Sequence, residues 1–178
     1  NEIAQSEAAT GKLLAHFWIH NEFVSIEGQK MSKSKGNIYT LHDIDKKGFE
    51  PLAYRYWLLT AHYRTSVNFT EEALEGAQTD LYEIWRKQSR SLSIRGIEPN
   101  GRINENYKKQ FTEIIEDDLN TPKAIALMHE MFKDDALSLE DQRVTFEDMD
   151  RILGIGAPSR NIPKSVQELV HKREDARK

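Results

Sequence analysis

The sequence predicts a mainly helical protein with a small mixed α/β part at its N-terminal end. Within the first 50 residues, the aromatic and β-branched residues at 17–26 favour one or two strands. After about residue 50, apolar residues recur with the 3.6-residue period of amphipathic helices. A lone strand pair is only marginally stable in water, and no partner strand is evident. We therefore expect the sheet to be completed by chain preceding residue 1.

The N-terminal elements are predicted from local residue types. Residues 3–15 carry small and apolar side chains and predict a short helix that Gly11 interrupts. One or two strands follow over 17–26. The stretch EGQKMSKSKGN at 27–37 is lysine-rich, contains glycines and has no apolar period, so it predicts a loop.

The helices after residue 50 are predicted from their starts and apolar stripes. They begin at Pro51, Thr70, Asn104, Thr121 and Ser138, and a last segment begins near Ser165 and continues to Lys178. Thr70 opens a long helix, with Leu74, Ala77, Leu81, Ile84, Trp85 and Gln88 on one face. Residues 96–103 are turn-rich and predict a linker, and Gly154 ends the helix that Ser138 opens.

Composition excludes several classes of protein. The 178 residues contain no cysteine, so the chain holds neither a disulfide nor a thiol nucleophile. The 25 basic and 29 acidic residues give a net charge of −4, which argues against a strongly basic nucleic-acid binder but not against a local basic site. No stretch approaches the length of a membrane span, and the start does not resemble a signal peptide. A cytoplasmic location is therefore allowed.

The most informative stretch is the lysine-rich loop. Lys30, Lys33 and Lys35 concentrate positive charge between Gly28 and Gly36. This arrangement suits a polyphosphate, and one such contact can contribute roughly 3 kcal/mol in a transition state for nucleotidyl transfer. On residue types alone, a solvated lysine loop is the more common outcome.

The order of these residues resembles a known signature. KMSKS at 30–34 is similar to the signature of class I aminoacyl-tRNA synthetases, and its flanks resemble the cysteinyl-tRNA synthetase family in particular. The similar stretches follow the order of that family and lie at 1–12, 17–37, 51–74, 117–131 and 169–178. Lys35 departs from the pattern, since the family often has an apolar residue there.

The resemblance implies three regions. They are the end of a Rossmann-type catalytic domain with the KMSKS loop (1–48), a stem-contact region (49–68) and a helical tRNA-binding bundle (69–178). The implied enzyme activates cysteine with ATP and Mg²⁺, transfers it to tRNA(Cys), and acts as a monomer in the cytoplasm. The HIGH-type motif of class I enzymes is absent from the sequence, so the 178 residues alone are expected to be inactive.

The resemblance also implies site residues. Lys30, Met31, Ser32, Lys33 and Ser34 would bind ATP, with Lys30 and Lys33 as catalytic residues on the triphosphate. Glu2 matches a zinc ligand of the family whose partner ligands lie outside this chain. The zinc would select cysteine over serine, because a thiolate bonds zinc far better than a hydroxyl does. From position alone, Glu2 would be an ordinary surface acid.

Other candidates carry alternatives. Arg55, His62, Tyr63 and Arg64 could contact the tRNA acceptor stem or simply form salt bridges. Three further groups have structural interpretations: His16 and His20 as a structural pair, Tyr56, Trp57 and Trp85 as core, and the acids at 117–118 and 141–150 as solvated faces.

Two rival functions stay open at this stage. One is a related ATP-dependent ligase that joins cysteine to an amino sugar; the predicted helices over 104–178 argue against it, because a small acceptor needs no such bundle. The other is a non-catalytic tRNA-binding helical module. The intact KMSKS argues against that function, since a pure binder needs no triphosphate loop.

Overall fold

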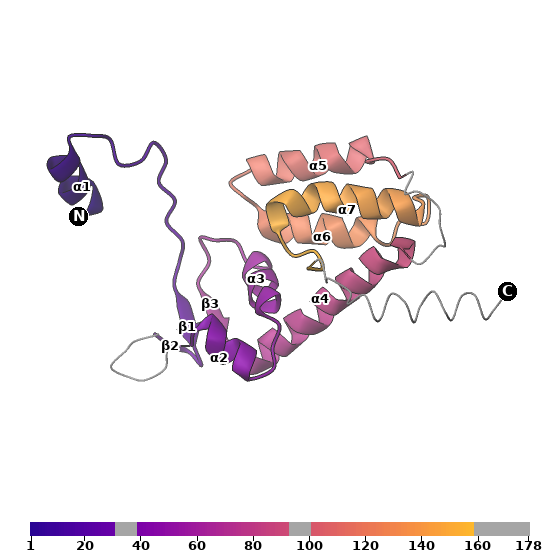
Figure 1. Ribbon diagram of the computed structural model, residues 1–178, viewed down its shortest axis with the longest axis horizontal. Helices are drawn as coiled ribbons and strands as arrows, with labels where there is room; N and C mark the ends of the chain where they lie inside the picture. The colour runs from indigo at the N-terminus through magenta and orange to yellow at the C-terminus, as the bar shows by residue number, and fades with distance from the viewer. Residues whose placement is uncertain (31–38, 93–100, 159–178) are drawn as a thin grey trace, which may run out of the picture.

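The computed structural model describes residues 1–30, 39–92 and 101–158, and it is mainly helical with one small sheet (Figure 1). In chain order the elements are α1 (Glu2–Thr10), β1 (Val24–Ile26), β2 (Gln29–Lys30), α2 (Leu41–Lys46), α3 (Pro51–Leu59), β3 (Val67–Phe69), α4 (Glu71–Leu92), α5 (Glu105–Glu116), α6 (Thr121–Met131) and α7 (Leu139–Leu153). Helix α4 runs from the sheet to the bundle formed by α5, α6 and α7. This arrangement confirms the predicted mainly helical class with a small sheet.

The sheet has three strands in the order β2-β1-β3. β1 pairs antiparallel with β2, with Ser25 opposite Lys30, and parallel with β3, with Val24 opposite Val67. The expectation that the N-terminal strands lack partners within this chain is therefore wrong. β3 has only three residues, too few to give the alternating pattern by which a strand is recognised.

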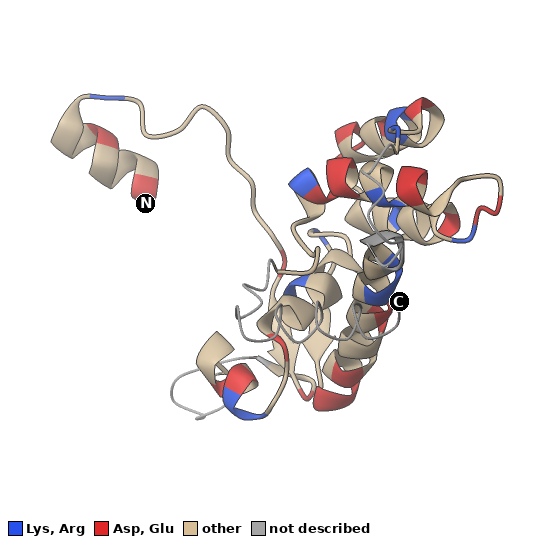
Figure 2. Cartoon of the chain, turned by 45° about the vertical axis from the view of Figure 1, so that its right-hand side comes forward, with Lys and Arg blue, Asp and Glu red and all other residues tan. Residues whose placement is uncertain are grey.

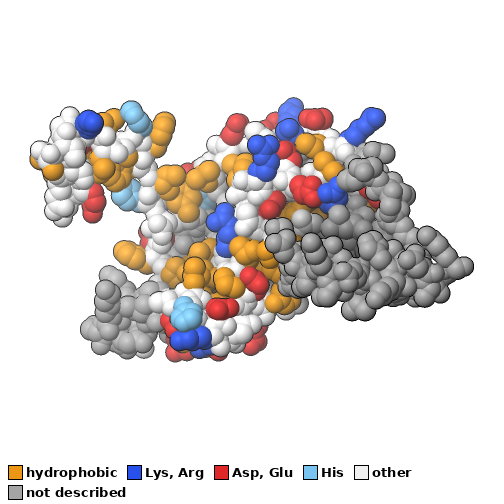
Figure 3. Space-filling model, in the orientation of Figure 1, with side chains coloured by type: hydrophobic (Ala, Val, Ile, Leu, Met, Phe, Trp, Pro, Cys, Tyr) orange, Lys and Arg blue, Asp and Glu red, His pale blue; other side chains and the backbone are white. Residues whose placement is uncertain are grey.

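The N-terminal arm consists of α1 and the extended segment before β1. Helix α1 ends at Thr10, earlier than predicted, because Gly11 adopts a φ of 64° and caps it in the left-handed conformation. Residues 17–23 form no strand, so only the end of the predicted 17–26 stretch does. No residue of α1 is buried, and apolar side chains lie exposed along the arm (Figure 3), including Phe17, which is 89% exposed.

Two short helices follow the KMSKS region. Helix α2 was not predicted; it has a capping box in which Thr40 Oγ1 accepts from the Asp43 backbone N–H and the Asp43 carboxylate accepts from Thr40 N. Helix α3 begins at Pro51, as predicted, because proline fits the first helical position. Tyr56, predicted to be a core residue, is 2% exposed.

Helix α4 confirms the predicted long amphipathic helix. Thr70 Oγ1 accepts a hydrogen bond from the Ala73 N–H, which is the geometry of an N-cap. The predicted stripe is buried from Leu74 to Trp85. The Trp85 indole, also predicted to lie in the core, donates to the Ile155 carbonyl at 2.8 Å and so ties the chain after α7 to α4.

The bundle helices begin close to their predicted starts. Asn104 and Ser138 cap α5 and α7 through their side chains, and Gly154 ends α7 in the left-handed conformation. The cap of α6 is Asn120, one residue before the predicted Thr121. The last predicted helix, from about Ser165, and most of the predicted linker lie outside the described residues.

The acidic residues of α7 are more than a solvated face. Asp141 accepts a hydrogen bond from Arg102 N at 2.6 Å, and Asp150 Oδ1 accepts from the backbone N–H groups of Ile155 and Gly156. The expectation for these two residues is therefore corrected: Asp141 satisfies a backbone donor in the segment that leads into α5, and Asp150 satisfies two backbone donors where the chain leaves α7.

Neither the charge pattern nor the apolar length of the described helices points to a particular kind of partner. Acidic and basic residues are interspersed along α4 to α7 (Figure 2). The charge pattern of the described helices therefore does not by itself mark a nucleic-acid surface. Within the described ranges, no helix is long and apolar enough to cross a bilayer.

Candidate functional site

The KMSKS motif begins at the end of a tight hairpin. β1 and β2 are joined by Glu27 and Gly28, whose φ values are 49° and 74°. Two successive positive φ values are typical of a type I′ turn, whose twist matches that of the strands it joins. Lys30, the first lysine of the motif, is the last residue of β2. The side chain of Lys30 and the whole of Met31, Ser32, Lys33 and Ser34 lie outside the described residues, so their predicted roles are untested.

Asn68 of β3 holds the hairpin turn. Its Oδ1 accepts a hydrogen bond from Gly28 N at 2.7 Å and another from Ser25 Oγ at 3.1 Å. Gly28 N has its acceptor in this amide oxygen, which reaches across from the neighbouring strand. Sequence reasoning did not single out Asn68, because one exposed asparagine in a three-residue strand gives no signal of its own.

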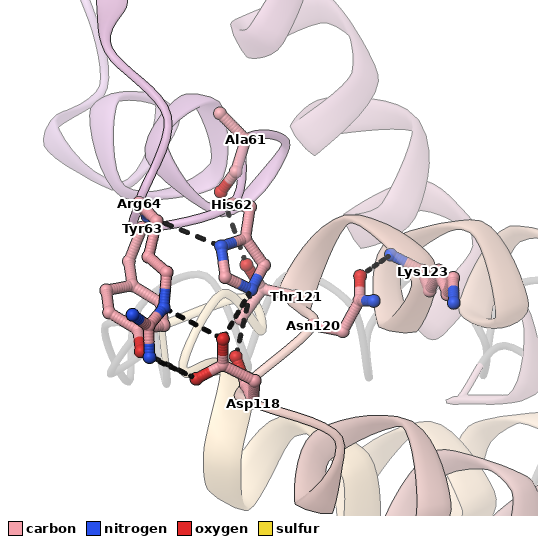
Figure 4. Close-up of polar contacts among 8 residues, drawn as sticks. All are labelled: Ala61, His62, Tyr63, Arg64, Asp118, Asn120, Thr121 and Lys123. Carbon is pink, nitrogen blue, oxygen red and sulfur yellow. Dashed lines mark hydrogen bonds and ion pairs between the residues drawn. The ribbon is translucent and has the colours of Figure 1, made fainter. Parts of the chain in front are cut away.

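A second group of polar contacts surrounds Asp118 at the turn between α5 and α6 (Figure 4). The Arg64 guanidinium donates to both carboxylate oxygens, with Nε 2.9 Å from Oδ2 and Nη2 3.1 Å from Oδ1. The Tyr63 hydroxyl donates to Oδ1 at 2.6 Å. His62 Nε2 lies 2.9 Å from the Asp118 carbonyl oxygen. We call these four residues the Asp118 cluster.

The hydrogen bonds of the His62 ring indicate which tautomer a neutral ring adopts. Its Nδ1 accepts from the Arg64 backbone N–H at 3.3 Å, so a neutral ring carries its proton on Nε2 and donates to the Asp118 carbonyl. The ring stacks on Tyr63 with centroids 4.8 Å apart, and the Arg64 guanidinium lies 5.1 Å from the centre of the Tyr63 ring. The three consecutive side chains are therefore held in one arrangement.

The cluster shifts the pKa values of its members. The Arg64 guanidinium, then the Tyr63 hydroxyl, lower the pKa of Asp118 by hydrogen bonding to its carboxylate. The same contacts with Asp118 raise the pKa values of Tyr63 and Arg64. These directions describe an ionised aspartate with two donors. The Asp118 side chain is 48% exposed, as predicted for a solvated acid, but its contacts with Tyr63 and Arg64 were not predicted.

Only part of the predicted tRNA-contact group comes together. His62, Tyr63 and Arg64 converge on Asp118, whereas Arg55 donates from Nε to the Leu153 carbonyl at 2.6 Å at the end of α7. All four side chains thus make contacts within the protein. Contact with tRNA is untested. Of the four residues, Arg64 forms a salt bridge with Asp118, whereas Arg55 bonds to backbone carbonyl oxygens.

A cavity of about 320 Å³ lies beside the cluster. It lies between the extended segment before β1, the end of α3 and the α5–α6 turn, with Leu58, Val67 and Leu119 among its apolar walls. Its lining also includes Asn21 and Glu22. Side chains therefore do not fill the space between the sheet side of the molecule and the α5–α6 turn.

Glu2 lies in the first turn of α1 with an exposed side chain. Its carboxylate is 3.3 Å from the N-terminal amine. Hydrogen bonds from its own backbone N–H and from that amine lower its pKa, with a smaller effect of His20. Within the described part of the chain, no three His, Cys, Asp or Glu side chains form a group that could hold a metal. Glu2 alone therefore does not make a zinc site.

Comparison with known proteins identifies two family models. Residues 1–79 match the model for the class I (C) tRNA synthetase catalytic domain, and residues 110–155 match the DALR domain. The first match includes the hairpin and the 62–64 part of the Asp118 cluster. The second includes the Asp118 turn and helices α6 and α7. The cluster therefore joins residues from the two matched regions.

Individual curated relatives match the same parts of the chain. The chain is 38% identical to a cysteine–tRNA ligase of Caldicellulosiruptor saccharolyticus over 100% of this chain and 42% of that protein. It is 36% identical to cysteine–tRNA ligase 1 of Burkholderia lata over 99% of this chain and 37% of that protein. A cysteine–tRNA ligase of Trichodesmium erythraeum is 40% identical over 75% of this chain and 29% of its own length. The chain thus spans well under half the length of these relatives.

Proposed function

Because the chain belongs to the cysteinyl-tRNA synthetase family, we propose that the protein is a cysteine–tRNA ligase that activates cysteine with ATP and charges tRNA(Cys). The observation that carries the proposal is a match to cysteine–tRNA ligases through the whole chain, hairpin and bundle alike. Within it, residues 1–48 are the end of a Rossmann-type domain, 49–68 the stem-contact region and 69–178 the tRNA-binding bundle. We also propose that the protein acts in the cytoplasm and as a monomer.

The KMSKS residues have the central chemical role in this proposal. Lys30 and Lys33 would bind the triphosphate of ATP together with Mg²⁺, and Met31, Ser32 and Ser34 would also contribute to ATP binding. Negative charge grows on the leaving pyrophosphate during activation, so a positioned ammonium stabilises the transition state more than the ground state. The tight hairpin that ends at Lys30 supports this role, because it fixes where the motif begins.

Glu2 is the one residue of this chain that we propose as a zinc ligand. Among the described residues, the exposed Glu2 carboxylate belongs to no group of three or more possible ligands, which does not fit the four-ligand set that zinc requires. We therefore derive no step through the metal. Metal analysis of Glu2→Gln against Glu7→Gln, in the longest protein that the gene encodes, tests the assignment: zinc content should fall in the first variant only.

The relatives also bear on the choice of acceptor. The three proteins described above are named cysteine–tRNA ligases, and two of them match over the bundle as well as the hairpin. A ligase that uses an amino sugar would have no use for helices α5 to α7. A tRNA acceptor is therefore favoured over the amino sugar, and an enzyme over a non-catalytic tRNA-binding module.

A charging assay tests the function. The longest protein that the gene encodes should attach radiolabelled cysteine to tRNA(Cys) and should catalyse pyrophosphate exchange that depends on cysteine. Serine in place of cysteine, and a tRNA of another specificity, serve as controls. Exchange without charging of tRNA would favour the amino-sugar ligase, and the absence of both activities would favour the tRNA-binding module.

A further inference from the structure

Hydrogen bonds connect the α5–α6 turn to the sheet through the segment 60–66. On one side, His62, Tyr63 and Arg64 contact Asp118, as described above. On the other side, the Tyr63 carbonyl accepts from Glu22 N at 2.8 Å, immediately before β1. The segment 60–66 therefore lies between the bundle and the strand that leads into the hairpin.

The same connection continues into the hairpin. The Phe23 carbonyl accepts from Val67 N at 3.3 Å and from Ser66 Oγ at 3.1 Å, which aligns the start of β1 with β3. Asn68, the next residue of β3, holds the turn at Gly28. Hydrogen bonds, joined by short stretches of backbone, thus lead from Asp118 to the hairpin that ends at the first residue of KMSKS.

Polar contacts carry this connection because apolar packing there is incomplete. The cavity of about 320 Å³ separates the arm before β1 from Leu119. The turn itself has an uncommon backbone, since Asp118 and Leu119 both have a φ of 54°. Non-glycine residues adopt this conformation at a cost, and it persists where surrounding contacts hold it. The Arg64 and Tyr63 bonds to Asp118 are contacts of that kind.

We propose that Asp118 is a positioning residue that sets the orientation of the bundle relative to the KMSKS hairpin. This inference rests on the proposed function. Activation of cysteine requires only small molecules near the hairpin, whereas transfer also requires a tRNA held by the bundle. Asp118 therefore acts on charging of tRNA and leaves activation unchanged.

The test uses Asp118→Asn and Arg64→Gln in the longest protein that the gene encodes. Asparagine keeps the size of the side chain but loses the charge that pairs with Arg64. We expect kcat/KM for tRNA in charging to fall by about 10-fold, while cysteine-dependent pyrophosphate exchange stays within about two-fold of wild type. The double variant should lose little more than the worse single variant, because the two side chains act as one unit.

Two further variants separate positioning from general stability. Tyr56→Phe removes a different polar contact between α3 and the bundle, the 2.9 Å bond to His129, and leaves the segment 60–66 unchanged. It should lower the melting temperature without selective loss of charging. Asp118→Glu, which can pair with Arg64 again, should recover at least half of the charging lost in Asp118→Asn.

Three results would overturn the inference. They are a parallel loss of exchange and charging in Asp118→Asn, no loss of either, or the same split in Tyr56→Phe. If Asp118→Asn does not fold, Arg64→Gln at an exposed side chain provides the same comparison. A wild-type protein without exchange or charging would instead contradict the proposed function, so the two failures are distinguishable.

Discussion

The Tyr56 hydroxyl lies 2.9 Å from Nε2 of His129, and this contact joins α3 to α6 in the interior. Burial, with a contribution from Asp80, raises the pKa of Tyr56 to about 12, so the hydroxyl stays protonated and donates a hydrogen bond to the ring. Burial, then the nearby Lys87, lowers the pKa of His129. A neutral ring with an acceptor at Nε2 satisfies both observations.

This relationship predicts a dependence of stability on pH. A histidine whose pKa is lower in the folded state is protonated more readily in the unfolded chain. Its contribution to stability is present above the unfolded value of about 6.5 and is lost as pH falls toward the folded value. We expect the free energy of unfolding in urea to decrease between pH 7.5 and pH 5.5. His129→Gln should reduce that decrease, whereas His42→Gln, at an exposed position, should not. Equal slopes in His129→Gln and wild type would contradict the assignment.

Gly101 predicts a steric effect at the entry to the bundle. A Cβ at this position would overlap the Glu140 carbonyl oxygen and lie 2.8 Å from Val144 Cγ2. Because backbone cannot easily move aside, Gly101→Ala should destabilise the protein by about 1–3 kcal/mol in denaturant unfolding. Gly76→Ala is the matched control: it lies inside α4 with open space around it and should stabilise by about 0.5–1 kcal/mol. A Gly101→Ala variant as stable as wild type would show that the linker can shift.

The contacts of Asn68 predict how firmly the hairpin turn is held closed. Asn68→Ala removes the acceptor for Gly28 N and Ser25 Oγ, so the turn should open more often. Amide hydrogen exchange of Gly28, followed by NMR, should accelerate by about 10-fold. Asn68→Asp keeps an oxygen at the same position and should largely preserve protection. Unchanged exchange in Asn68→Ala would mean that strand pairing alone holds the turn.

Features with several local signals were predictable from the sequence. Helix α4 combined the Thr70 cap, an acidic first turn and a long apolar stripe, and each of these signals agrees with the structure. Helices α5 and α7 likewise combined a capping side chain, Asn104 or Ser138, with an amphipathic run of residues. Agreement between cap, charge and period makes such helices recognisable without tertiary information.

Features that depend on distant partners were not predictable. β3 is a strand because β1 lies beside it, and three residues carry too little pattern to indicate this. The pairing of Asp118 was not predicted because its donors lie more than fifty positions earlier in the chain. The KMSKS residues were identified by resemblance, since lysine spacing alone favours a solvated loop. Local propensity therefore accounts for the helices, and long-range pairing for the sheet and the cluster.

Lys33→Ala should lower the rate of cysteinyl-adenylate formation by about 10²-fold or more in the longest protein that the gene encodes. The reason is that the ammonium acts on charge that develops on the leaving pyrophosphate, so it stabilises the transition state beyond the ground state. Affinity for cysteine should change little, because cysteine carries none of that charge. The measurement is cysteine-dependent pyrophosphate exchange over a range of ATP and cysteine concentrations.

Lys35→Ala is the matched control for this prediction. It removes the same charge from the same stretch but lies outside the five-residue signature. If Lys33 acts at a defined place on the triphosphate, Lys35→Ala should lower the exchange rate by less than about five-fold. Equal losses in the two variants would mean that total positive charge, rather than one placed ammonium, is what the reaction uses. Weaker cysteine binding at an unchanged rate in Lys33→Ala would place Lys33 near the amino acid and away from the triphosphate.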